Sequence, residues 1–250
     1  MIDLKLLKPY AHKYQIDEFT VLREYLQLVF LNAFFGKVGS HEITFKGGTA
    51  LRLAYGSPRF SEDLDFNCRV EPKELKVLLE KSVSVAGRAV PDLYFKELET
   101  IKGYSAKLYL KTTIAPMPLT VKLDFSFREQ SENVVSRTIA TELPVQSFSL
   151  VPIMSAEEIL AEKMRTIFQR KKGRDVYDIW YLLNKKIAVD LSLVNRKMAL
   201  IGKEFAMGEF LEQLDLFNRK SLEGDLFKFL PHNERSIVSK LPSLIKGMLL

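Results

Sequence analysis

The sequence predicts an α/β or α+β half built on a mixed sheet, followed by a helical half. Residues 92–153 contain four segments rich in aromatic and β-branched residues, separated by turn-forming residues, which is typical of successive strands. From Ser155 almost to the end, apolar residues recur at helical spacing. Because the pattern changes near Pro152, we expect two domains, at 1–152 and 153–250.

The predicted elements of the first half alternate between helices and strands. A long helix is expected over 17–35, and a short helix over 49–55 that ends at a glycine; a third covers 73–87. The expected strands cover 42–45, 63–70, 92–101, 104–114, 119–127 and 142–153.

Composition places the chain among ordinary globular proteins, with 47% hydrophobic and 27% charged residues. The N-terminal "MIDLKLLKPY" lacks the hydrophobic region of a signal peptide, and the apolar run "LQLVFLNAFF" is too short to span a bilayer. We therefore expect a cytoplasmic protein with no membrane partner.

The charge of the chain favours one class of ligand, and its cysteine content excludes one kind of structural link. The net charge of +6 favours polyanions such as RNA, DNA or nucleotides, although many unrelated soluble proteins are equally basic. Cys68 is the only cysteine, and three scattered histidines accompany it, which excludes an internal disulfide and argues against a zinc site.

The glycine pair Gly47–Gly48 lies where a predicted strand meets a predicted helix. Glycine permits close approach of a ligand to the backbone, and the free N–H groups of a helix N-terminus attract phosphate. Thr49 would cap this helix or bind a phosphate oxygen. A plain glycine turn with a threonine cap explains "GGT" equally well, so this motif alone does not decide.

Asp63 and Asp65 are separated by one residue in a predicted strand. Side chains two apart in a strand point the same way, so both carboxylates would face outward while Leu64 and Phe66 face the core. Two close carboxylates repel unless a cation lies between them, and Mg²⁺ prefers such oxygens. The alternative to a metal site is a strand at the edge of the sheet whose two acids simply face solvent.

A third acid, Asp124, lies in the alternating segment "TVKLDFSF". If this strand lies beside the first, Asp124 would complete a site for two Mg²⁺ ions with Asp63 and Asp65. Lys122 would point to the same side of the strand as Asp124.

The helical half contains charges in unexpected places. Ser155 and Glu158 form a capping-box pattern that marks a helix start. Lys163 falls in the apolar stripe of this helix, between Ile159 and Ile167, and needs an anionic partner. A phosphate, a nearby acid, or exposure of the ammonium group at the edge of the stripe would each satisfy it.

Downstream, "RKKGRDVYDIWYLL" combines a basic cluster with two acids. Asp175 and Asp178 share a helical face, and each is more often structural than catalytic when considered alone. The basic residues suit either solvated surface or RNA contacts: Arg170, Lys171, Lys172 and Arg174.

Together, "FKGGTALR", "RFSEDLDF", "VKLDFSF" and "EEILAEKMRTIFQRKKGRDVYDIWYLL" resemble the abortive-infection AbiEii/AbiGii nucleotidyltransferase toxin family over residues 45–183. The resemblance implies a polymerase-β-like nucleotidyltransferase core, a mixed sheet with flanking helices, followed by a helical domain. It implies an NTP substrate, Mg²⁺, a cognate antitoxin and an RNA acceptor, the 3′ end of tRNA.

The resemblance also implies roles for individual residues. Metal ligands would be Asp63, Asp65 and Asp124. The three acids, Lys163 and Asp178 would be catalytic, and the nucleotide would contact Gly47, Gly48, Thr49, Arg174 and Asp175. Apart from the resemblance, we expect Arg59 and Lys122 to contact the nucleotide, with Lys163 and Arg59 neutralising phosphate charge. Two other functions use the same residues: transfer of a nucleotidyl or phosphoryl group to protein, and a non-catalytic module that binds nucleic acid.

Overall fold

The computed structural model describes residues 4–36, 42–100, 103–112, 116–145 and 150–250. The chain divides into two compact units. The core unit comprises Met1–Gly56 and Phe60–Met154, and the helical unit comprises Ser57–Arg59 and Ser155–Leu250. None of the helices in the described ranges combines the length and apolar character that crossing a bilayer requires.

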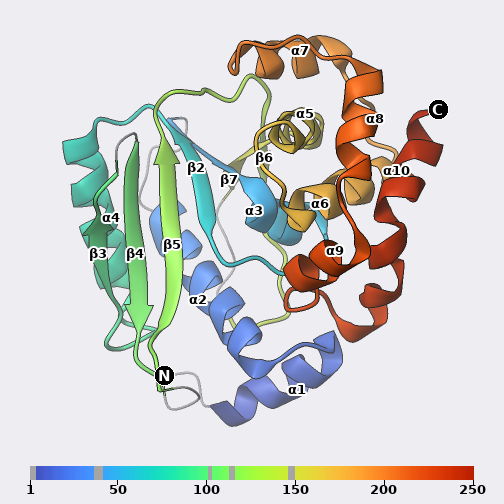
Figure 1. Cartoon of the computed structure of the whole chain (residues 1–250). Helices are drawn as coiled ribbons and strands as arrows, with labels where there is room; N and C mark the ends of the chain where they lie inside the picture. The colour runs from blue at the N-terminus through green and yellow to red at the C-terminus, as the bar shows by residue number, and fades with distance from the viewer. Residues whose placement is uncertain (1–3, 37–41, 101–102, 113–115, 146–149) are drawn as a thin grey trace. The chain divides into compact units, whose positions relative to one another are not determined.

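The core unit is built on a seven-stranded sheet in the order β3-β4-β5-β2-β1-β7-β6 (Figure 1). The pairs β2/β5 and β1/β7 are parallel and the other neighbours are antiparallel, so the sheet is mixed, as predicted. The strands are β1 (Ile43–Lys46), β2 (Leu64–Cys68), β3 (Tyr94–Leu98), β4 (Tyr104–Leu110), β5 (Leu119–Ser126), β6 (Val134–Arg137) and β7 (Val151–Met154).

Strand β5 shows how the sequence gives the sheet two different faces. Every second residue of β5 from Leu119 is buried, and the residues between them are half-buried. Because side chains alternate along a strand, the apolar set lies on one side and the polar set on the other. We call the side that carries Lys122 and Asp124 the polar face, and the opposite side the covered face.

Helices α2 (Glu18–Phe35) and α4 (Pro72–Ala86) pack on the covered face, behind the strands in the view of Figure 1. The ring centroid of Phe34 in α2 lies 5.5 Å from that of Phe66 and 6.0 Å from that of Phe125. Phe66 and Phe125 stack at 4.7 Å between centroids. This aromatic cluster fixes β2 beside β5. The other helices of the core unit are α1 (Leu4–Tyr14) and α3 (Gly47–Tyr55).

The helical unit is organised around α5, which contacts α6, α7 and α8. The backbone N–H of Glu158 donates to Ser155 Oγ at 3.2 Å, so the predicted cap at the start of α5 is confirmed. The helices are α5 (Ala156–Ile167), α6 (Gly173–Asn184), α7 (Leu191–Ala199), α8 (Met207–Asp215), α9 (Arg219–Leu226) and α10 (Leu241–Leu249), with a 3₁₀ segment at His232–Lys240.

Some predicted boundaries were wrong. Helix α3 begins at Gly47 rather than after the glycine pair. Of the strand expected over 142–153, residues 151–153 lie in β7, and the other described residues, 142–145 and 150, are not in a strand; β6 was not predicted. The side chains of β6 are mostly exposed, so it lacks the alternation that marks the other strands. Residues 101, 113–114 and 146–149 of predicted strands lie outside the described residues.

Candidate functional site

The turn from β1 into α3 brings backbone and carboxylate together. Helix α3 begins at Gly47, directly after the last residue of β1. Gly47 has φ of 78°, and a Cβ there would overlap the Asp65 Oδ2 atom. Glycine therefore lets the Asp65 carboxylate lie against the first turn of α3. That turn also offers N–H groups without intrahelical partners and the positive end of the helix dipole.

The predicted capping role of Thr49 was wrong. The N-cap position is Lys46, whose side chain makes no capping hydrogen bond. Thr49 is 1% exposed, and its hydroxyl donates to the backbone oxygen of Asp63 at 2.5 Å. Its side chain therefore holds the segment before β2 against α3 and fixes the backbone from which the Asp63 side chain projects.

Asp65 and Asp124 lie on adjacent strands at the same height. The parallel pairing of β2 with β5 places Asp65 opposite Asp124, which confirms the expected adjacency of these two strands. Leu64 and Phe66 are fully buried, as predicted, while Asp65 is half-buried. Asp63 immediately precedes β2 and is half-buried.

Lys122 lies among these acids. Its Nζ is 2.7 Å from Asp124 Oδ2, and the Ser105 hydroxyl donates to Asp124 Oδ1. Burial lowers the pKa of Lys122, but the hydrogen bond and charge of Asp124, with the charges of Asp63 and Asp65, outweigh burial and raise it. All three carboxylates therefore stabilise one cation on the polar face.

The donor chemistry of this cluster fits a divalent cation. Among the residues that the structure describes, no group of three or more His, Cys, Asp or Glu side chains already has the geometry of a metal site. Two of the three carboxylates are nevertheless adjacent in the ladder, and the Lys122 ammonium shows that positive charge is favoured beside them. Carboxylate oxygens are the hard ligands that Mg²⁺ prefers.

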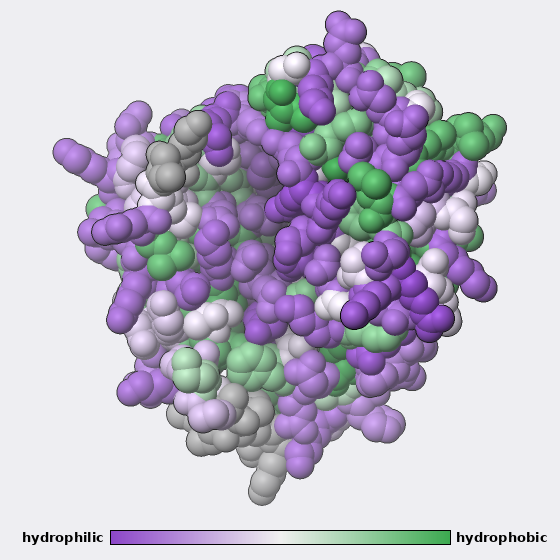
Figure 2. Space-filling view, in the orientation of Figure 1, coloured by the Kyte–Doolittle hydropathy of each residue, from purple (hydrophilic) through white to green (hydrophobic). Residues whose placement is uncertain are grey.

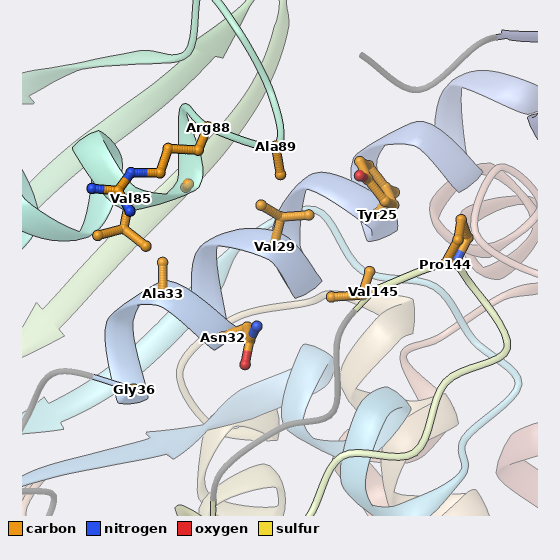
Figure 3. Close-up of a pocket in the computed structure, with 11 residues that line it drawn as sticks. Tyr25, Val29, Asn32, Ala33, Gly36, Val85, Arg88, Ala89, Pro144 and Val145 are labelled. Carbon is orange, nitrogen blue, oxygen red and sulfur yellow. The ribbon is translucent and has the colours of Figure 1, made fainter.

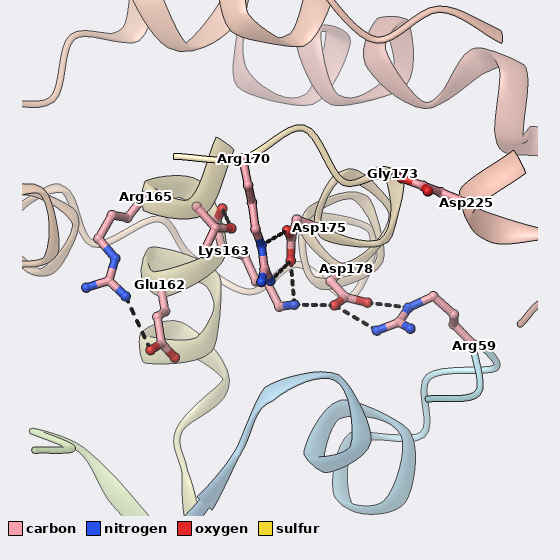
Figure 4. A network of polar contacts seen from close by, with 10 residues as sticks. Arg59, Glu162, Lys163, Arg165, Arg170, Gly173, Asp175, Asp178 and Asp225 are labelled. Carbon is pink, nitrogen blue, oxygen red and sulfur yellow. Dashed lines mark hydrogen bonds and ion pairs between the residues drawn. The ribbon is translucent and has the colours of Figure 1, made fainter. Parts of the chain in front are cut away.

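The helical unit contains a separate network of buried charges (Figure 4). Lys163 Nζ lies 2.8 Å from Asp175 Oδ1 and 2.7 Å from Asp178 Oδ2. Arg59 binds Asp178 through two hydrogen bonds, of 2.8 and 2.9 Å. Arg59 is 2% exposed and Asp178 is fully buried. The interaction is therefore a buried, bidentate ion pair within this unit.

Arg170 extends the network at the surface end, where its Nε lies 2.9 Å from Asp175 Oδ2. Burial alone would raise the pKa of Asp175, but Lys163 and Arg170 outweigh burial and hold it below its usual value. The pKa of Lys163 is lowered by burial and raised more strongly by Asp175 and Asp178. Lys163 and Arg59 were expected to neutralise phosphate; in the structure their charges are neutralised by acids.

Arg174 lies in the first turn of α6, and its guanidinium carbon is 5.0 Å from the ring centroid of Phe229. The structure thus assembles the predicted residues in two groups. The group in the core unit is Gly47, Gly48, Thr49, Asp63, Asp65, Lys122 and Asp124, and the group in the helical unit is Arg59, Lys163, Arg174, Asp175 and Asp178.

A cavity of about 620 Å³ lies elsewhere in the core unit (Figure 3). It is lined by α2 and α4, with Pro144 and Val145, so it belongs to the covered side of the sheet. Its described lining includes Asn32 and Arg88 but no carboxylate, and it is therefore distinct from the acid cluster.

Sequence reasoning missed two buried polar residues that each bind a carboxylate. Ser105 on β4 lies directly opposite Asp124 and orients its carboxylate. Lys197 on α7 is 2% exposed and binds Glu158 at 2.6 Å. A lysine next to Met198 and four residues after Leu193, both buried, gave a usable signal for the second. The first depends on a strand pairing that the sequence does not reveal.

Comparison with known proteins decides the family. A sequence model described as "Nucleotidyl transferase AbiEii toxin, Type IV TA system" matches residues 30–238, which is more than half of the chain. The chain belongs to the AbiEii nucleotidyltransferase toxin family. No curated protein sequence matches it.

Solved structures agree with the fold of this AbiEii chain. MenT4, a nucleotidyltransferase toxin from Mycobacterium tuberculosis H37Rv, is 18% identical, with a TM-score of 0.63 over 98% of this chain and 90% of that one. JHP933 from Helicobacter pylori is 21% identical, with a TM-score of 0.60 over 93% of this chain and 91% of that one. The AbiEii family implies a nucleotide substrate and, as part of a type IV toxin–antitoxin system, a cognate antitoxin.

Proposed function

We propose that this toxin transfers a nucleoside monophosphate from an NTP to RNA, with the 3′ end of tRNA as the acceptor. The observation that carries the proposal is the pairing of Asp65 with Asp124 beside the glycine turn at Gly47. Sites for a phosphate and for a cation therefore lie together: α3 offers N–H groups for the phosphate, and β2 and β5 offer carboxylates for the cation.

Asp63, Asp65 and Asp124 would hold two Mg²⁺ ions, which would lower the pKa of the acceptor hydroxyl and neutralise charge on the leaving pyrophosphate. The backbone of Gly47, Gly48 and Thr49 binds the triphosphate at the helix N-terminus. The acceptor oxygen forms a bond to the α-phosphorus as the bond to pyrophosphate breaks.

Two side chains of β5 would assist this step. The proton of the attacking hydroxyl passes to Asp124, whose orientation Ser105 and Lys122 fix. Lys122 also lies beside the acids that would hold the metal ions. Its positive charge would there balance the charge of the substrate's phosphates.

The direct roles predicted for the helical-unit residues stay predictions: catalysis by Lys163 and Asp178, and nucleotide binding by Arg59, Arg174 and Asp175. The ion pairs support a positioning role in addition. Arg59 and Asp178 hold residues 57–59, the segment that follows α3.

The test is incorporation of labelled NTP into total tRNA, compared between the wild type, Asp65→Asn and Asp124→Asn. We expect each variant to lose at least about a hundredfold in rate, because charge at a metal-binding position is lost. Asp92→Asn is the matched control, since Asp92 is an exposed acid with φ of 66°, a conformation that asparagine also tolerates. Undiminished incorporation by both site variants would refute the mechanism. Label removed by protease rather than nuclease would identify a protein acceptor.

A further inference from the structure

Three lysines form a row across the polar face of β3, β4 and β5. Lys96 pairs directly with Lys107, and Lys107 pairs directly with Lys122. Direct partners on neighbouring strands lie about 5 Å apart and point to the same face. Like charges in that position repel, so the row destabilises the free protein unless anions lie beside it.

Only part of this repulsion is relieved within the chain. Lys122 has Asp124 at 2.7 Å, and Lys96 Nζ lies 5.9 Å from the ring centroid of Tyr109. The ammonium group of Lys107, in the middle of the row, forms no ion pair or side-chain hydrogen bond with any residue in the described part of the chain. The row is therefore suited to an external anion.

A tyrosine pair flanks the lysine row on the side away from the acids. Tyr94 on β3 lies directly opposite Tyr109 on β4, and their rings stack at 5.1 Å between centroids and 8° between planes. Tyr94 is 38% exposed. Tyr109 is half-buried, so the ring of Tyr94 is the one offered to a ligand. An exposed aromatic ring beside lysines is the combination that proteins use to stack the bases and bind the phosphates of single-stranded nucleic acid.

Acids, lysines and tyrosines follow one another in that order along the strands. On β5, Asp124 comes two residues after Lys122, a distance of roughly 7 Å, and Thr120, opposite Tyr109, comes two residues before it. Figure 2, in the orientation of Figure 1, shows largely hydrophilic surface over this part of the sheet.

We propose that Lys96, Lys107, Tyr94 and Tyr109 form a binding track for the single-stranded end of the acceptor polynucleotide, leading to the acid pair. The lysines bind phosphodiester groups and the tyrosines stack a base. The direction of the strand, with its terminal hydroxyl at Asp124, rests on the proposed function. Binding itself does not require transfer. A peptide rich in acidic residues would use the lysines but gain little from the tyrosine pair.

The test is fluorescence anisotropy with an end-labelled single-stranded RNA of about 12 nucleotides, in EDTA and without NTP, at several salt concentrations. We expect the double variant Lys96→Gln/Lys107→Gln to bind about tenfold more weakly. The log–log salt slope should fall by about 1.4, because each phosphate contact on a single strand contributes about 0.7.

Two further variants separate stacking from charge. Tyr94→Ala should weaken binding about fivefold or more with an unchanged salt slope, and Tyr94→Phe should bind like the wild type. The matched charge control is Lys81→Gln, because Lys81 is exposed on α4, which packs on the covered face. It should leave affinity and slope unchanged. Equal melting temperatures would show that all variants are folded.

The proposal would be overturned if the double variant bound RNA with the affinity of the wild type. It would also be overturned if polyglutamate competed as strongly as RNA of equal charge. The second result would assign the face to an acidic protein. Failure of the proposed function gives a different result: Asp65→Asn would then incorporate NTP normally while RNA binding still depended on the track. Loss of incorporation in Asp65→Asn together with track variants that bind RNA normally would reject the track alone.

Discussion

Asp65 and Asp124 are direct partners in the parallel ladder between β2 and β5, with both carboxylates on the polar face. Two acids in that relation raise the free energy of the folded chain unless positive charge is close by. Lys122 supplies one such charge, and its raised pKa reflects all three acids of the cluster.

This relationship predicts stabilisation by magnesium. If Mg²⁺ binds only the folded state, a Mg²⁺ concentration about 100 times the dissociation constant would add roughly 2.7 kcal/mol to the free energy of unfolding. We expect Mg²⁺ to raise the melting temperature of the wild type above its value in EDTA. Asp65→Asn should show a much smaller rise, and Asp92→Asn the full one. Thermal unfolding followed by circular dichroism provides the measurement, and equal shifts in all three proteins would disprove metal binding by Asp65.

Replacing Gly47 by alanine should damage both stability and activity. The backbone there has φ of 78°, and the added Cβ would displace the Asp65 carboxylate. We expect a loss of about 1–3 kcal/mol in the free energy of unfolding, together with reduced nucleotide incorporation. Urea denaturation gives the stability term.

Gly224→Ala is the matched control for this substitution. Gly224 lies inside α9, and a Cβ there meets nothing within 4 Å. Alanine should raise stability by up to about 1 kcal/mol, because it favours the helix. A Gly47→Ala protein as stable as the wild type would show that the close approach of Asp65 to Gly47 is not required.

The charge network of the helical unit predicts unequal effects of removing its members. Asp178→Asn leaves Arg59 and Lys163 short of a buried partner, which should cost about 3–5 kcal/mol. Arg170→Gln should cost less than about 1 kcal/mol, because 57% of the Arg170 side chain is exposed and water compensates for the lost pair. Urea denaturation of the two variants tests this ranking. Similar losses in the free energy of unfolding for both variants would contradict the prediction that the buried ion pairs of Asp178 matter more than the exposed one of Arg170.

Asp175 predicts a specific dependence of stability on pH. Its pKa is lowered in the folded protein, because Lys163 and Arg170 outweigh the effect of burial. A lowered folded pKa stabilises the protein above the unfolded value, near 4, and this contribution is lost as pH falls through the folded value. Urea denaturation between about pH 3 and 7 should therefore show the gap between wild type and Asp175→Asn narrowing below about pH 4. A gap independent of pH would refute the linkage.

The sequence predicts elements well where burial is periodic. The alternation in residues 119–127 located β5 and assigned Asp124 to its polar side, as the burial pattern confirms. Pairing of β5 with β2 stayed an expectation, because two strands and a helix separate them and local patterns carry no information about that contact. Strand β6 was missed because its side chains are mostly exposed.

The site shows the same division. Lys163 was identified as a lysine that needed an anion, because it interrupts an apolar stripe. The sequence could not choose between a phosphate and the acids of α6, since that depends on how two helices pack. For Thr49 the sequence offered a cap or a phosphate contact, and it could not reveal the hydroxyl's partner, because the backbone of Asp63 lies 14 positions further along the chain.

Residues 57–59 belong to the helical unit although the chain on either side of them belongs to the core unit. The polypeptide therefore passes between the units three times, and no single cut separates them. A fragment that ended at Met154 would keep Arg59 but lack Asp178, its carboxylate partner. The guanidinium of Arg59, which is buried in the intact protein, would then have lost its ion pair. Truncating this toxin at Met154 would for that reason yield a core unit without the ion pair that holds residues 57–59, rather than an autonomous half.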